Sequence, residues 1–265
     1  MTATALPATS GYAPVNGLGM YYEVHGAGDP LVLLHGAFSG IGTSFGELLP
    51  HLSRNRKVIA VEYQGHARTA DIDRPLSYAA IAGDVVGLLE HLGIERADVL
   101  GYSAGGGVAI ELAMRHPRSV RKVVLVSVTS TLEGCHPELM GGMDALTPEA
   151  LAGSPFEEEY LHLAPRPEDF PVLVEKVKAM NLAWTGWSAA DFAAIAAPAQ
   201  IVIGDSDLAR PEHAVEMFRL LGGGVFGDIH GLPACELAVV PGTTHVGITR
   251  RGEWLAPMVD SFLDR

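Results

Sequence analysis

Apolar residues in this chain gather in short runs, separated by stretches with the spacing of amphipathic helices. Continuous apolar runs of this length are typical of strands covered on both faces, as in a parallel sheet. Residues 20–26 (MYYEVHG) instead alternate apolar and polar side chains, which predicts a half-buried strand at a sheet edge. The continuous runs occupy residues 30–36, 57–63, 97–102, 120–128, 199–205 and 235–242.

Helical patterns lie between several of these runs. The segment 77–94 begins with Ser77, a candidate N-cap, and spaces its apolar residues three and four apart. Residues 211–224 open with a proline in the first turn and close on glycines, and residues 252–265 predict a closing helix with Pro257 as a candidate kink. Strands that alternate with helices predict an α/β fold, a mostly parallel twisted sheet with helices on both faces.

Two segments depart from this alternation. The first 15 or so residues are rich in Ala, Thr and Pro and predict a loose tail. Residues 129–198 carry no strand pattern, only short helical pieces. We therefore predict a core domain of residues 1–128 and 199–265 with an inserted helical cap at 129–198, because a connection of this length usually serves the site. The alternative is a long helical connection without a functional role.

Composition excludes several classes of partner. The 265 residues are 48% hydrophobic and 18% charged, which is typical of a globular protein, and 31 acidic against 18 basic residues give a net charge of −13. This charge disfavours binding to nucleic acid or to an anionic membrane. No apolar run approaches the roughly 20 residues of a membrane span, and the N-terminus lacks a signal-peptide pattern. We therefore expect a cytoplasmic protein in which Cys135 and Cys235 are structural thiols.

Candidate chemistry begins with Ser103 in Gly101-Tyr102-Ser103-Ala104-Gly105. A strand ends directly before this serine and a helix begins directly after it. Small flanking residues allow so tight a turn, and the helix N-terminus directs free N–H groups at the point where an oxyanion would form. The alternative is an ordinary glycine-rich turn. A phosphate-binding loop is disfavoured because its lysine is missing.

A second loop follows an earlier strand and reads His35-Gly36-Ala37-Phe38. A tetrahedral intermediate needs a second N–H donor from another loop, and Ala37 is the first candidate, with Phe38 as the runner-up. Its partner donor in the oxyanion hole would be the N–H of Ala104. We interpret His35 as an anchor of this loop rather than as a catalytic base, because it lies at the strand end.

Polar residues that are candidates for catalysis also follow two later predicted strands. Asp205 and Asp207 follow the run at 199–205, and Asp207 lies far enough along its loop to turn back over the sheet. Asp205 is expected to brace the turn. His245 follows the last strand after a Pro-Gly pair, although a lone histidine is more often a surface or packing residue. The order Ser, Asp, His at successive strand ends is the chain order of the α/β-hydrolase triad.

From about Tyr12 to its end the sequence resembles the α/β-hydrolase superfamily, in its capped esterase, lipase and epoxide-hydrolase-like branch. The resemblance is carried by LVLLHG, GYSAGG, GDSD and PGTTH, which occur in the family's order and spacing. By position, Ser103 matches the nucleophile, Asp207 the acid and His245 the base.

Some positions depart from the family's pattern. The segment YQGHART resembles a family segment but has Ala67 where a glycine is common, and Glu62 precedes it where an aspartate is common. The loop HGAF lacks the additional glycines and the following proline of several subfamilies.

The resemblance implies a serine hydrolase that cleaves small to medium carboxylic esters or lactones through an acyl-enzyme, without metal or cofactor. Alternatives are cofactor-free perhydrolysis or carbon–carbon bond hydrolysis with the same triad, and a ligand-binding receptor or regulator. Relatives that dehalogenate or open epoxides carry an aspartate in place of Ser103, which disfavours those activities. The oligomeric state and the natural substrate stay open.

The predicted substrate pocket is apolar, and about half of its candidates are expected to pack only within the cap. These candidates are Phe38, Met140, Met143, Leu161, Met180, Leu182, Trp184 and Trp187.

Overall fold

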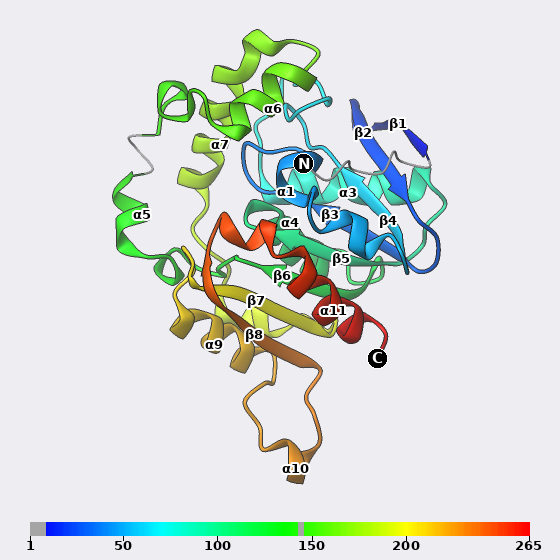
Figure 1. The fold of residues 1–265 in the computed structure, drawn as a ribbon, viewed down its shortest axis with the longest axis vertical. Coiled ribbons are helices and arrows are strands. Elements are labelled where there is room, and N and C mark those ends of the chain that lie inside the picture. Colours follow the sequence, from blue (N-terminus) through cyan, green and yellow to red (C-terminus); the bar gives the residue numbers. More distant parts are fainter. Residues whose placement is uncertain (1–8, 143–145) are drawn as a thin grey trace.

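The computed structural model describes residues 9–142 and 146–265, except for the side chains of residues 139–141 (Figure 1). Its centre is an eight-stranded sheet in the order β1-β2-β4-β3-β5-β6-β7-β8. β1 and β2 pair antiparallel, β2 runs antiparallel to β4, and all other neighbours are parallel. The predicted α/β fold is therefore confirmed. The strands are β1 Thr9–Val15, β2 Leu18–His25, β3 Pro30–Leu34, β4 Lys57–Val61, β5 Ala97–Tyr102, β6 Val120–Val126, β7 Ala199–Ser206 and β8 Cys235–Thr244.

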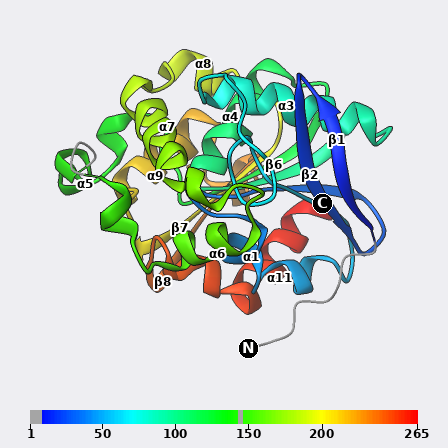
Figure 2. The same ribbon diagram turned by 90° about the horizontal axis from the view of Figure 1, so that it is seen from above.

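Helices cover both faces of the sheet (Figure 2). Successive strand residues point to opposite faces, so Val32 and Leu34 join one apolar cluster while Leu31 and Leu33 join the other. The first cluster packs under α3 (Tyr78–His91), α4 (Ala104–Arg115), α8 (Ala189–Ala193) and α9 (Pro211–Leu220). The second packs under α1 (Ile41–Phe45), α2 (Leu49–Leu52) and α11 (Gly252–Leu263).

The segment between β6 and β7 is helical in its described residues and contains no strand there. Figure 1 shows α6 and α7 stacked together above the sheet, with α5 set apart from them. The elements of this insertion are η1 Leu132–Gly134, α5 Pro137–Gly142, η2 Pro148–Leu151, α6 Pro155–Leu163, η3 Pro167–Asp169 and α7 Phe170–Ala183, followed by α8.

Two expectations about the N-terminal strands are wrong. Residues 9–15 form β1 rather than a loose tail, because their backbone pairs with β2 from Thr9 to Val15 and Ala13 and Val15 are buried. β1 therefore lies at the sheet edge, and the strand predicted there, β2, lies between β1 and β4.

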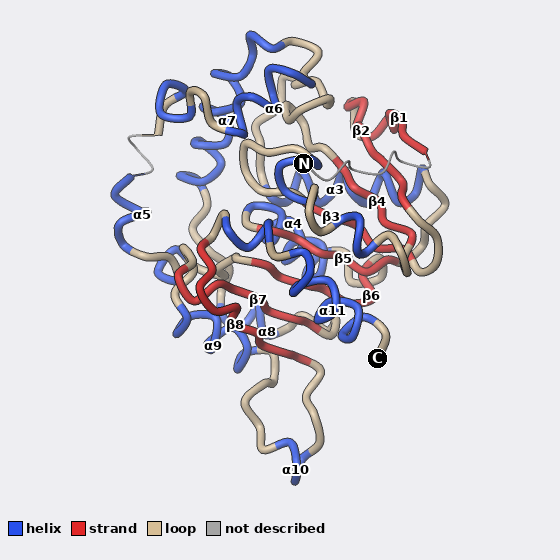
Figure 3. The backbone as a smooth tube through the Cα atoms, in the orientation of Figure 1, coloured by secondary structure: helices blue, strands red, loops and turns tan. Residues whose placement is uncertain are grey.

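The remaining helices agree broadly with the sequence pattern. α11 continues through Pro257, and α10 (Gly227–His230) lies on a loop that projects from the body (Figure 3). Across the described residues, no helix combines the length and the apolar character that crossing a bilayer requires. Cys135 and Cys235 are both buried and neither forms a disulfide, as expected for structural thiols.

Candidate active site

Ser103 occupies a strained turn between β5 and α4. Its backbone has φ 54° and ψ −119°, a conformation that side-chain-bearing residues rarely adopt. The turn depends on its glycines, because a Cβ at Gly101 would lie 2.1 Å from the carbonyl oxygen of Gly105. A Cβ at Gly105 would lie 2.0 Å from the carbonyl oxygen of Leu34. The glycines therefore let α4 approach the sheet closely enough to present Ser103 at the strand end.

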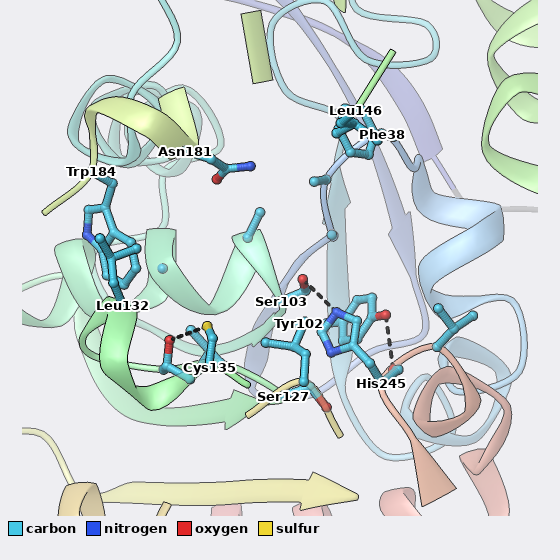
Figure 4. Close-up of a pocket in the computed structure, with 18 of the residues that line it drawn as sticks. Phe38, Tyr102, Ser103, Ser127, Leu132, Cys135, Leu146, Asn181, Trp184 and His245 are labelled. Carbon is cyan, nitrogen blue, oxygen red and sulfur yellow. Dashed lines mark hydrogen bonds between the residues drawn. The ribbon is translucent and has the colours of Figure 1, made fainter. Parts of the chain in front are cut away.

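A chain of hydrogen bonds joins three residues that are distant in sequence, and Figure 4 shows its first bond, between Ser103 and His245. The hydroxyl oxygen of Ser103 lies 3.0 Å from Nε2 of His245. Nδ1 of the same imidazole lies 2.8 Å from Oδ1 of Asp207. A carboxylate that accepts from Nδ1–H leaves Nε2 unprotonated and able to accept the serine proton. The structure thus brings the three residues together in the arrangement that nucleophilic catalysis requires.

The carboxylate of Asp207 is buried, and both of its oxygens accept hydrogen bonds. The N–H groups of Gly204 and Leu208 donate to it at 3.0 and 2.7 Å, and the hydroxyl of Ser127 donates to Oδ2. Burial alone would raise its pKa, but the hydrogen bond and charge of His245, with the bonds from Ser127 and Gly204, hold the pKa of Asp207 below its ordinary value. Asp207 is therefore ionised at neutral pH.

Ser127 and Tyr102 support this arrangement and were not singled out from the sequence. Ser127 directly follows β6 and has a strained φ of 52°. The ring of Tyr102 stacks on the imidazole of His245, with ring centres 5.3 Å apart, and its hydroxyl donates to the carbonyl oxygen of His245 at 3.1 Å. The position of Tyr102, directly before the serine, was the one sequence signal for its role.

Three backbone N–H groups near Ser103 are free to bind an oxyanion. Those of Ala37, Phe38 and Ala104 donate to no group within the described part of the chain. Ala37 and Ala104 both line the cavity beside Ser103. Phe38 has a positive φ of 63°, so the loop turns sharply between the two candidate donors. The structure leaves Ala37 and Phe38 both available as the second donor.

His35 has no free ring nitrogen. Its Nδ1–H donates to the carbonyl of Gly36 at 2.8 Å, and its Nε2 accepts from the backbone N–H of Tyr63 at 3.2 Å. Complete burial lowers the pKa of His35 well below its usual value, so the ring is neutral. His35 anchors the loop, as the sequence analysis expected.

Asp205 likewise braces the backbone and takes no part in the hydrogen-bond chain. Its two oxygens accept from the N–H groups of Gly242 and Thr243 at 2.8 and 3.1 Å. These bonds hold the end of β8, which continues through Pro241 and Gly242 to Thr244, and so fix the strand from which His245 projects.

A cavity of about 520 Å³ opens beside Ser103 and His245. Of the predicted pocket residues, Phe38, Leu182, Trp184 and Trp187 line this cavity. The described residues that also line it include Tyr78, Ser127, Val128, Thr129, Leu132, Cys135, Glu138, Leu146, Leu151, Phe156, Asn181, Leu208 and Val246.

Two predicted pocket residues lie elsewhere. Leu161 is 48% exposed on α6, and Met180 is buried in the core cluster under α7, so neither borders the cavity. An apolar helix residue packs against whichever neighbour its face of the helix meets. The sequence shows that the residue is apolar but not whether that face meets the core or the cavity. Met143 lies outside the described residues, as does the side chain of Met140. In the described part of the chain, no cluster of three or more His, Cys, Asp or Glu side chains is arranged to hold a metal ion.

Glu159 of the inserted segment binds the loop that follows Phe38. Its carboxylate accepts from the backbone N–H of Gly40 at 2.7 Å and of Thr43 at 3.0 Å. A Cβ at Gly42 would lie 2.7 Å from Oε1 of Glu159, so a glycine is needed for this contact. α6 is therefore fastened to the loop that carries the candidate oxyanion donors.

The departures from the family pattern at Glu62 and Ala67 lie next to this loop. Ala67 is buried with φ 43°, a conformation that glycine adopts without strain. Glu62 is fully buried at the end of β4 and accepts from the backbone and the guanidinium of Arg68 at 2.8 and 2.6 Å. Burial raises the pKa of Glu62 from 4.5 to about 7, against the opposing effect of Arg68.

This raised pKa makes stability depend on pH. The folded state holds a proton that the unfolded chain releases, so the contribution of Glu62 is fully present below pH 4.5 and is lost as the pH rises through about 7. The loss is on the order of 3 kcal/mol. We expect the unfolding free energy of Glu62→Gln, measured by urea unfolding, to rise relative to that of the wild type as the pH increases from 5 to 8. Parallel pH curves for the two proteins would contradict this expectation.

A serine on a strand–helix turn, an imidazole and a buried carboxylate at the ends of parallel strands define the α/β-hydrolase class. The family model described as "alpha/beta hydrolase fold" matches residues 29–188, and the chain belongs to this family.

The relatives that the chain resembles have several activities. It is 36% identical over 113 residues to a protein named putative carbamate hydrolase RutD from Caulobacter sp. strain K31, and 38% identical over 104 residues to 2-hydroxymuconate semialdehyde hydrolase from Pseudomonas sp. strain CF600. These alignments cover 41% and 38% of this chain and only 42% and 37% of the relatives. The chain thus matches about two fifths of the length of each relative.

Solved structures agree in fold over nearly all of the chain. A meta-cleavage product hydrolase from Pseudomonas fluorescens IP01 superimposes with a TM-score of 0.72 at 19% sequence identity, covering 97% of this chain and 98% of that one. An identity this low shows the fold alone. The fold of the protein is thus that of the α/β-hydrolase family to which the chain belongs.

Proposed function

We propose that this protein is a serine hydrolase that cleaves small to medium carboxylic esters or lactones. The observation that carries the proposal is the continuous hydrogen-bond chain from Ser103 through His245 to Asp207, with the serine hydroxyl at the wall of an apolar cavity. Nucleophile and base within hydrogen-bond reach, and a third group that orients the base, are the signature of an activated nucleophile.

The geometry supports a two-stage reaction. As the Ser103 oxygen attacks the substrate carbonyl carbon, Nε2 of His245 takes the serine proton, and the buried carboxylate of Asp207 stabilises the imidazolium. The N–H groups of Ala104 and of Ala37 stabilise the oxyanion, and loss of one such donor costs about 100- to 1000-fold in kcat. His245 then protonates the leaving alcohol, which departs and leaves an acyl-enzyme. Water gives a proton to His245, attacks the acyl carbon and releases the acid and the free serine.

The inserted helices fit the role of a cap. Residues of η1, α5 and α7 and of the stretch after α7 form much of the cavity wall, while the core supplies Ser103 and His245. Because the wall is largely apolar, it favours the acyl and alkyl groups of esters and lactones over water. The core at 1–128 and 199–265 and the cap at 129–198 thus remain our proposed division of the chain.

Carbon–carbon bond hydrolysis is the second candidate, favoured by the relative that acts on 2-hydroxymuconate semialdehyde. The same triad serves both reactions, so turnover decides between them. A muconate carries a carboxylate, which the cavity would have to accommodate.

A fluorophosphonate probe tests the proposed nucleophile. We expect one equivalent of probe on the wild-type protein, located by peptide mass spectrometry at Ser103, together with hydrolysis of p-nitrophenyl esters of increasing acyl length and of simple lactones. Labelling at another residue, or a protein that binds these esters without turnover, would contradict the proposal and favour a ligand-binding receptor.

A further inference from the structure

Aromatic rings form the far wall of the cavity. The rings of Trp184 and Trp187 lie 4.9 Å apart, and that of Tyr78 lies 5.9 and 5.7 Å from them. Trp187 is fixed in place, since its Nε1–H donates to Glu111 at 2.8 Å. Such a wall binds flat or extended apolar groups through area and ring contacts.

Away from His245, the described wall of the cavity offers no cation. None of its described lining residues is Lys or Arg, and Glu138, which is exposed, is the one acidic residue among them. Residues 143–145, outside the described part, are Met, Asp and Ala, and residues 139–141 are Leu, Met and Gly, so they add no positive charge. The whole chain carries a net charge of −13, which repels anions over longer distances.

The amide of Asn181 is a neutral donor at this cavity. Oδ1 of Asn181 accepts from the hydroxyl of Tyr78 at 3.4 Å, and burial raises the pKa of Tyr78 to about 12, so that this hydroxyl stays a donor. That bond orients the amide and leaves its NH₂ group without a partner in the described residues. Figure 4 shows the amide nitrogen pointing into the open space of the cavity.

From these three observations we infer that the site selects uncharged substrates: esters or lactones whose far end is an apolar group with a neutral oxygen acceptor for Asn181. Substrates whose far end is a carboxylate are rejected. The inference rests on the proposed function and adds the substrate class to it.

The physical reason is the desolvation of a charge. A carboxylate that leaves water for an apolar wall loses its hydration, and without a cation the one hydrogen bond from Asn181 does not compensate for that loss. The N–H groups beside Ser103 attract negative charge, but the oxygen of the reacting carbonyl occupies them during catalysis. A neutral ester or ether oxygen, in contrast, gains one hydrogen bond from the Asn181 amide at little desolvation cost.

Three substrates with one reacting centre test this selectivity. They are mono-p-nitrophenyl adipate, which ends in a carboxylate; its methyl ester, which ends in a neutral acceptor; and p-nitrophenyl heptanoate, which ends in an alkyl group. We expect kcat/KM for the adipate at pH 7.5 to be at least about 100-fold below that for its methyl ester. Values within about fivefold would overturn the inference.

Binding separates this inference from the proposed reaction. In the Ser103→Ala protein, calorimetry gives the Kd of the same adipate and its methyl ester without hydrolysis. We expect at least about 30-fold weaker binding of the adipate, and equal Kd values would overturn the inference whatever the wild-type turnover is. Selective binding without turnover by the wild type would overturn the proposed function alone.

A variant tests the role of Asn181. We expect Asn181→Leu to lower kcat/KM for the methyl ester about 5- to 10-fold relative to the heptanoate, the effect of one neutral hydrogen bond. The heptanoate is the internal control, because a damaged fold lowers both values together. An unchanged ratio would remove Asn181 from the inference.

Discussion

Ser103→Ala lowers kcat for p-nitrophenyl esters by about 10⁵- to 10⁶-fold, the range seen when the nucleophile of a triad is removed. The reason is that the remaining imidazole and carboxylate have no hydroxyl to activate, so only the oxyanion donors and substrate binding still act. Initial rates with purified protein, compared with the spontaneous hydrolysis of each ester, measure the effect.

The fold provides a control for this result. The side chain of Ser103 bonds to His245, and alanine meets the same backbone strain at φ 54° that serine does, so the variant is expected to keep the wild-type unfolding midpoint. Labelling by the fluorophosphonate is lost at the same time. A folded Ser103→Ala protein that still turns over esters at the wild-type rate would refute the assigned nucleophile.

Asp207→Asn lowers kcat about 10⁴-fold, while Asp205→Asn changes it less than about tenfold. An asparagine at 207 places an amide NH₂ group where a carboxylate oxygen accepts the proton of Nδ1 in the wild type. The imidazole of His245 therefore changes to its other tautomer. Nε2 of His245 then carries a proton and no longer accepts the one from Ser103. The two substitutions are chemically identical and two residues apart, so Asp205→Asn is a matched control.

The two aspartates differ in their burial and in their hydrogen-bond partners. Asp207 receives its donors in the core and contacts His245, whereas Asp205 is exposed and bonds to the backbone N–H groups of Gly242 and Thr243. Asp205→Asn is therefore expected to act mainly on stability, measured by thermal unfolding. A larger loss of kcat from Asp205→Asn than from Asp207→Asn would show that the acid has been misassigned.

The central strands could be predicted because each is buried on both faces and reads as an apolar run. β1 could not, since Gly11 and Pro14 interrupt its pattern and its pairing with β2 alone keeps it extended. The three residues of the hydrogen-bond chain were found together because each follows a strand, and parallel strands end on one edge.

Other parts of the site depend on contacts between distant segments. The bonds of Ser127 to Asp207 and of Tyr102 to His245 join different strand ends, and no local pattern marks them. The same limit explains the errors in the pocket. Leu161 and Met180 have the apolar character of a pocket residue, but the packing of α6 and α7 decides which side chain faces solvent, core or cavity.

The hydrogen bonds of Glu159 to Gly40 and Thr43 have a consequence for the way in which the size of a substrate affects its turnover. Because this carboxylate of α6 bonds to the loop after Phe38, we expect the helix and the loop to move together. We expect a substrate bulky enough to displace α6 also to displace the loop that carries the candidate oxyanion donors. Excess bulk is then expected to lower the rate of the proposed chemical step as well as the affinity for substrate.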